Sequence, residues 1–214
     1  MNKDLMTYLQ ESIIPMYQTF DPAHREDHVY KVIEQSLEIA KDFDCDLDMV
    51  YTVACYHDIG IQFGRSDHHL TGGIFLYDDE RLKSFFNEEQ RIIMKEAVED
   101  HRASNDYPPR SIYGKIIAEA DRDISVDVVF LRTVQFGLKH YPDLSKEDHI
   151  KRAIGHIEEK YGPHGYLKLW LKTKKNEEGL KEIHKLLEDP KRIKSIFESL
   201  YEQEKNKKTN NVIS

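Results

Sequence analysis

The sequence predicts an all-α protein, and two observations lead to this fold class. Apolar residues recur at helical spacing along most of the chain, and helix-start signals precede several of these apolar segments. No stretch between turn signals alternates apolar and polar residues with a period of two, so no strand is predicted. The pattern corresponds to about nine helices in 214 residues.

The helical elements are predicted from periodicity and from their start signals. Asn87 and Gln90 form a capping-box pattern, and Ser111 precedes another apolar helix. Asp-Pro and Ser-x-x-Asp patterns indicate further starts at Asp21-Pro22, Ser145 to Asp148, and Asp189-Pro190. The predicted helical segments cover residues 3–18 with an interruption near Pro15, residues 24–43, residues 46–58, a segment from His68, residues 92–101 and a segment from Ser111.

Length and charge limit the organisation and the function classes. With 214 residues and 39% hydrophobic residues, the chain is long enough to bury a core, and we expect one domain over residues 1–204. Residues 205–214 are polar and are predicted to form a flexible tail. The formal net charge of −8 argues against a protein that binds duplex nucleic acid or a membrane surface, because such proteins normally carry a basic face.

The N-terminal composition and the cysteines indicate a cytoplasmic protein. Residues 1–10 include Asp4 and no long apolar run, so we expect neither a signal peptide nor a membrane anchor. The two cysteines, Cys45 and Cys55, make no disulfide framework and have no metal-binding spacing.

Residues 50–59 carry the most chemical information. An apolar stripe along a predicted helix runs into His57, which Asp58 follows directly. An imidazole and a carboxylate are costly to bury unless both are paired, and a metal ion satisfies both groups at once. The same arrangement recurs on three other predicted helices, where His28, His101 and Asp121 lie on the apolar side. Each residue alone is more often a hydrogen-bonded core residue, but the recurrence on four helices favours a shared metal site.

The order of these residues resembles the HD-domain metal-dependent phosphohydrolases. His28, the His57-Asp58 pair and the distant Asp121 match the family's signature in order and approximate spacing, over about residues 20–130. The resemblance implies a single helical HD-domain fold around a central metal site. Residues 131–204 would then be additional C-terminal helices beyond the family's core motifs.

Two further patterns refine the resemblance, the first to HD proteins with two metal ions and the second to HD proteins that hydrolyse diadenosine polyphosphates. His68 precedes a Gly72-Gly73 pair at the expected spacing, and residues 98–101 and 115–121 resemble that subgroup's helix pair. His68 fits the spacing better than the adjacent His69. By this likeness, a first metal ion is held by His28, His57, Asp58 and Asp121, and Asp58 bridges to a second ion held by His68 and His101. The longer motif of HD proteins that act on cyclic di-GMP is missing.

The residue types suit phosphate hydrolysis. Imidazoles and carboxylates without thiolates favour one or two divalent ions of Mn, Fe, Co, Ni or Mg over a closed structural zinc site. A bound ion lowers the pKa of its water and supplies hydroxide near neutral pH. The sequence therefore predicts a metal-dependent phosphohydrolase that uses a metal-activated water to cleave a phosphate ester or anhydride of a nucleotide or small phosphorylated metabolite. Phosphomonoesterase, phosphodiesterase and nucleotidase activities all stay open.

Phosphate transfer also needs positive charge near the non-bridging oxygens. Asp58 and His57 are the predicted catalytic residues at the metal site, joined by Lys115 and Arg122 as cations. The resemblance favours Lys115, whereas Arg122, Arg65 and Arg102 have the alternative of being solvated surface arginines. His24 lies four residues before His28 and either reaches the same site or caps its helix.

Two other functions compete with the hydrolase. The metal site could belong to a nucleotide-sensing regulatory module that binds metal and ligand without turnover, or the metal could be purely structural. The expected partner is a small phosphorylated substrate, with no duplex nucleic acid and no membrane. Self-association stays open.

Overall fold

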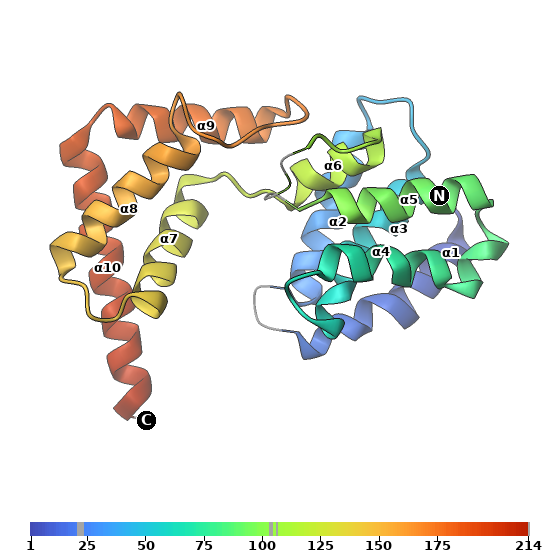
Figure 1. Cartoon of the computed structure of the whole chain (residues 1–214), viewed down its shortest axis with the longest axis horizontal. Helices are drawn as coiled ribbons and strands as arrows, with labels where there is room; N and C mark the ends of the chain where they lie inside the picture. Colours follow the sequence, from blue (N-terminus) through green and yellow to red (C-terminus); the bar gives the residue numbers. More distant parts are fainter. Residues whose placement is uncertain (21–23, 103–104, 106, 214) are drawn as a thin grey trace. The chain divides into compact units, whose positions relative to one another are not determined.

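The all-α prediction is confirmed by the structure, a computed structural model (Figure 1). It describes residues 1–20, 24–102, 105 and 107–213, with side chains through residue 207. These residues form ten α-helices, where about nine were predicted, together with four short 3-10 or π helices and no strand. Within the described part, no helix is long and apolar enough to cross a membrane.

The chain divides into two compact units, residues 1–122 and residues 123–214. The prediction of one domain over residues 1–204 stays a prediction, as does the mobility of the tail, where the last helix continues to Ile213. The first unit contains α1 (Lys3–Tyr8), α2 (Glu26–Ala40), α3 (Leu47–Tyr56), α4 (His68–Asp78), α5 (Glu88–Asp100) and α6 (Ile112–Asp121). The second unit contains α7 (Val126–His140), α8 (Lys146–Tyr161), α9 (Lys174–Leu187) and α10 (Pro190–Ile213).

The predicted helix starts that the structure describes are confirmed. Asn87 and Gln90 form a reciprocal capping box, in which each side-chain oxygen accepts from the other residue's backbone N–H at 2.9 and 3.0 Å. The side chains of Ser111 and Ser145 cap α6 and α8, and Asp189 accepts from the Arg192 N–H at the start of α10. The predicted start at Asp21-Pro22 lies outside the described residues.

The first predicted helix changes type near the expected interruption. It continues from α1 as a π-helix, η1 (Leu9–Ile13), and then as a 3-10 helix, η2 (Ile14–Thr19), in which Pro15 is near the first position. Proline has no N–H to donate within a helix, so the α-helical hydrogen-bond pattern does not pass through it.

The centre of the first unit is α3. Every residue of this helix from Met49 to Tyr56 is buried, and the helix contacts α2, α4, α5 and α6. A helix that is apolar on all sides is expected only inside a core. The C-terminal end of α3 therefore delivers the next residues, His57 and Asp58, into the interior of the unit.

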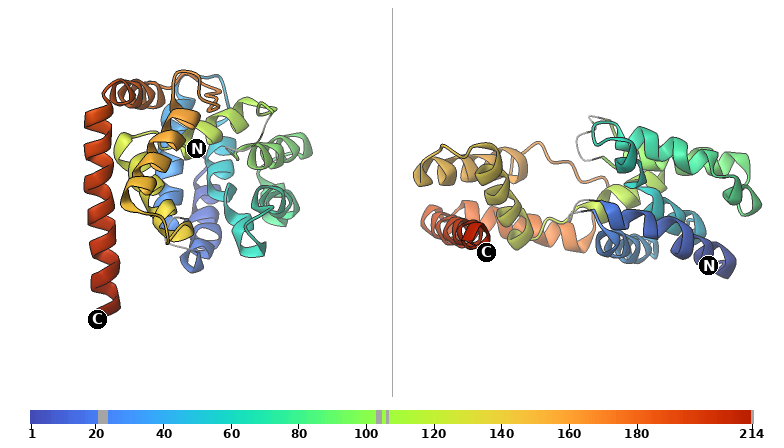
Figure 2. Two further views of the ribbon diagram at one scale, coloured as in Figure 1. Left: turned by 60° about the vertical axis from the view of Figure 1, so that its left-hand side comes forward. Right: turned by 90° about the horizontal axis from the view of Figure 1, so that it is seen from below.

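The second unit has a separate apolar core. Phe130 and Phe197 stack with ring centroids 4.6 Å apart, and Ile157 and Ile183 are fully buried beside them. These residues come from α7, α8, α9 and α10, and the C-terminal end of α10 extends beyond the other helices of this unit (Figure 2).

Candidate metal centre

Six of the residues singled out in the sequence converge inside the first unit. They come from five helices that are separated in the sequence. His28 lies on α2, His57 and Asp58 follow α3, His68 opens α4, His101 follows α5 and Asp121 ends α6.

Asp58 lies at the centre of this group. Its Oδ2 atom is 3.3 Å from His57 Nε2 and 3.6 Å from His28 Nε2. Its Oδ1 atom is 3.3 Å from His68 Nε2 and 3.5 Å from His101 Nε2. Each carboxylate oxygen therefore faces two imidazoles.

Two sets of candidate ligand atoms result, and Asp58 belongs to both. The first set is His28, His57 and Asp58, and the second is Asp58, His68 and His101; within each set the ligand atoms lie within 4.8 Å of one another. Asp121 adjoins the first set, because its Oδ1 is 3.2 Å from His28 Nε2.

Backbone carbonyls orient three of the four imidazoles. The Nδ1 atoms of His57, His68 and His101 lie 2.8, 2.9 and 2.6 Å from the carbonyl oxygens of the residues three positions earlier. A carbonyl can only accept, so each Nδ1 carries a proton, and Nε2 is the ring nitrogen that faces Asp58 and is left for a metal ion. Metal-ligating histidines have this arrangement, and the donor set therefore fits a divalent cation.

The electrostatics of the group agree with this fit. Asp58 is 4% exposed, and although burial raises its pKa, the surrounding imidazoles lower it well below the usual value. Burial lowers the pKa of His28, but the Asp121 and Asp58 carboxylates prevail and raise it to about 9. The pKa of buried His101 is raised by the same two carboxylates against the effect of burial. The carboxylates thus stabilise positive charge at this place.

Close backbone packing sets the position of His68 relative to Asp58. A Cβ added to Gly60, in the 3-10 helix η3 (Ile59–Phe63), would lie 2.0 Å from the His68 carbonyl oxygen. A Cβ added to Gly73 of α4 would lie 2.9 Å from Cγ of Glu99 on α5. Glycine at these two positions lets α4 approach both neighbours, which brings His68 and His101 to the same carboxylate.

The two predicted catalytic cations belong to α6 and its C-terminal cap. Arg122 donates from Nη1 to Glu119 Oε1 at 2.6 Å, and both side chains are buried. Lys115 is half-buried on α6, six residues before Asp121. Their catalytic roles stay predictions.

One structural element of the site was missed from the sequence. The buried Asp100 carboxylate, next to His101, accepts the Arg110 backbone N–H at 2.7 Å and the Arg110 guanidinium at 2.8 Å. The same guanidinium donates to Glu99 Oε2 at 2.6 Å. Arg110 follows two prolines in a segment without helical periodicity, so no sequence pattern fixed the direction of its side chain.

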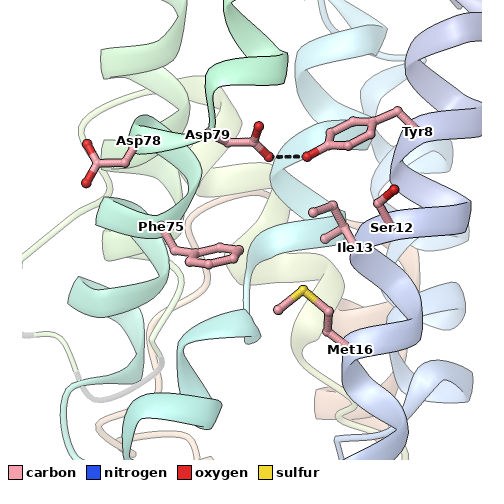
Figure 3. Close-up of a pocket in the computed structure, with 7 residues that line it drawn as sticks. All are labelled: Tyr8, Ser12, Ile13, Met16, Phe75, Asp78 and Asp79. Carbon is pink, nitrogen blue, oxygen red and sulfur yellow. Dashed lines mark hydrogen bonds between the residues drawn. The ribbon is translucent and has the colours of Figure 1, made fainter.

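The first unit also has an open groove that none of the six convergent residues lines. It has a volume of about 390 Å³ and lies between the N-terminal helices and α4 (Figure 3). Tyr8 donates to Asp79 at 2.5 Å along one edge, and buried Tyr56 donates to the same oxygen. This carboxylate is thus occupied by tyrosine hydroxyls, and the groove lining is otherwise mostly apolar. The lining residues are Tyr8, Ser12, Ile13, Met16, Phe75, Asp78 and Asp79.

A comparison with protein families identifies the same region. A family model described as HD domain matches residues 25–124, a range that includes all six convergent residues. The chain is also similar to the crystal structure of a predicted HD superfamily hydrolase from an uncultured Thermotogales bacterium. That similarity has 23% identity and a TM-score of 0.46, and it covers 72% of this chain and 84% of the other. A comparison with curated proteins found no match.

Proposed function

We propose that the chain is a metal-dependent phosphohydrolase of the HD-domain superfamily, whose family model matches residues 25–124. Its substrate is a phosphate ester or anhydride of a nucleotide or small phosphorylated metabolite, and it acts in the cytoplasm. The observation that carries the proposal is the position of Asp58, whose two oxygens each face two imidazoles.

In this proposal the two ligand sets hold one ion each. His28, His57, Asp58 and Asp121 would hold the first ion, and Asp58, His68 and His101 would hold the second. Divalent ions bound there would lower the pKa of a water molecule and offset the negative charge of the phosphate.

The chain's own residues supply the orientation. The carbonyls that accept from Nδ1 of His57, His68 and His101 hold the three rings, so their Nε2 atoms need no rearrangement. Asp58 stays ionised because its pKa is held well below the usual range. Lys115, and Arg122 held by Glu119, are proposed to balance charge on the non-bridging oxygens of the substrate.

The test measures metal content and phosphate release together. Protein loaded with Mn²⁺, Fe²⁺ or Co²⁺ is incubated with nucleotides, dinucleoside polyphosphates and sugar phosphates. Asp58→Ala is expected to lose bound metal and to lower turnover by at least about 10³-fold. Asp42→Ala, at an exposed carboxylate, is the matched control and keeps both properties.

The outcomes separate the competing functions. An unchanged rate in Asp58→Ala would overturn the hydrolase. Ligand binding by the metal-loaded wild type without product after long incubation would favour the nucleotide-sensing module. Metal that raises the melting temperature without any phosphorylated ligand binding would favour a structural role.

A further inference from the structure

Tyr17 is a fully buried tyrosine of the N-terminal segment that contacts the residues of the candidate metal centre. It lies on η2. Its hydroxyl donates to the Cys55 carbonyl oxygen at 2.9 Å, close to the C-terminal end of α3. Its ring stacks on the His57 ring, with centroids 6.5 Å apart and an angle of 27° between the ring planes.

The hydroxyl contact lies where α3 ends and the ligands begin. The last carbonyls of a helix have no N–H partner within the helix, so other groups have to donate to them. The Ala54 carbonyl accepts from His57 Nδ1 at 2.8 Å. The Cys55 carbonyl accepts from Tyr17, so a side chain donates to each of these two neighbouring oxygens. Together the two contacts hold the turn from which His57 and Asp58 project.

The segment around Tyr17 also adjoins the helix that carries His28. The Phe20 ring lies 5.0 Å from the Tyr17 ring, between ring centroids, and η2 packs against α2. The Phe20 carbonyl oxygen accepts from Nε of Arg25, the N-cap residue of α2, at 3.4 Å. This segment therefore contacts both helices that supply the histidines of the first ligand set.

We propose that Tyr17 positions the first ligand set, acting through the Cys55 carbonyl and the His57 ring. The inference concerns the metal centre on which the proposed function rests. Tyr17 precedes residues 25–124, so this contribution comes from outside the part of the chain that the HD-domain model matches. Groups that orient metal ligands typically change metal affinity by about 10–100-fold, whereas a tyrosine that only fills the core would change stability alone.

The test compares two variants that each remove one buried hydroxyl. Tyr17→Phe keeps the ring and removes only the hydrogen bond to the end of α3. Tyr56→Phe is the matched control, because Tyr56 is equally buried and directly precedes His57. Its hydroxyl donates to Asp79, the C-cap residue of α4, and not to a group at the metal centre.

Co²⁺ is titrated into the metal-free full-length proteins, and the affinity and the visible absorption spectrum of the bound ion are recorded. Tyr17→Phe is expected to bind Co²⁺ about tenfold more weakly than wild type, with a changed spectrum. Tyr56→Phe is expected to keep the spectrum and to change the affinity less than about twofold. If Tyr17→Phe does not fold, Phe20→Leu takes its place, because it removes a ring that packs on Tyr17, and is expected to weaken binding about threefold.

Two results would overturn the inference. Wild-type affinity and spectrum in Tyr17→Phe would make this tyrosine a core residue only. Equal weakening in Tyr17→Phe and Tyr56→Phe would assign the loss to stability in general. Both results leave the hydrolase proposal standing, because that proposal is decided by phosphate release in Asp58→Ala.

Discussion

His101 and His149 show how two equally buried histidines differ between the two units. His101 is 3% exposed in the first unit, and His149 is 4% exposed in the second. Burial lowers the pKa of both, but Asp58 and Asp121 reverse the effect at His101 and raise its pKa. At His149 the charges of Arg152 and Lys205 act in the same direction as burial, so its pKa is lowered.

Burial alone therefore does not distinguish a metal-ligating histidine from a core histidine in this protein, whereas the sign of the surrounding charge does. The interior around His101 contains carboxylates and favours an added cation. The charges that act on His149 are those of half-buried Arg152 on α8 and exposed Lys205 on α10, and the ring packs 5.4 Å from Tyr201.

Substituting one glycine in each unit tests the packing that the metal centre requires. Gly60→Ala would place a Cβ against the His68 carbonyl, so the backbone has to move, and we expect a loss of about 3 kcal/mol in the free energy of unfolding. Gly155→Ala on α8 places its Cβ in open space and should raise the free energy of unfolding by about 0.5–1 kcal/mol. Urea unfolding checks both values, and equal effects would contradict this account of Gly60.

Removing one arginine in each unit tests the Asp100 contact. Arg110→Ala leaves the buried Asp100 carboxylate without its guanidinium partner, so we expect the free energy of unfolding to fall by about 2 kcal/mol. We also expect weaker metal binding at the adjacent His101. Arg132→Ala, at an exposed position of α7, should change stability by less than about 0.5 kcal/mol. If metal titration gives the same affinity for Arg110→Ala as for wild type, Asp100 has no part in positioning His101.

The smallest expected effect is the pH dependence from His149. Its folded pKa lies below the ordinary value of 6.5, so the unfolded chain binds a proton first as the pH falls. The stability contribution is complete above pH 6.5 and is lost as the pH falls below it. His149→Gln should therefore reduce the stability difference between pH 7 and pH 5. If the free energy of unfolding changes with pH in the same way for wild type and variant over this range, the result would contradict this role of His149.

The sequence predicted the fold class and the convergent residues because apolar stripes fix which face of a helix is buried. His28, His101 and Asp121 were assigned from their spacing to apolar neighbours, and the structure brings them together with Asp58. The starts of α7 and α9 had no predicted signal. Their cap residues, Ser125 and Thr173, make no side-chain capping hydrogen bond in the structure, so residue type alone is uninformative there.

The contacts that were not predicted lie in segments without a helical period. Arg110 reaches Asp100 from the segment before α6, and Arg65 reaches His24 across the loop before α4. The direction of these side chains depends on the loop backbone, which next to Arg65 includes Gly64 at a φ of 127° and the Ser66 carbonyl that accepts from Arg102. Such tertiary contacts follow no regular spacing in the sequence, so they cannot be predicted from it.

The most direct measurement of the central claim is the number of Mn²⁺ ions bound per chain in His101→Ala and in His149→Ala. Both variants remove one buried imidazole, and the charges that surround the two imidazoles have opposite signs. We predict that His101→Ala binds less Mn²⁺ than wild type, whereas His149→Ala binds the same amount. Equal metal content in the two variants, whether both reduced or both unchanged, would contradict the assignment of the metal centre to the first unit.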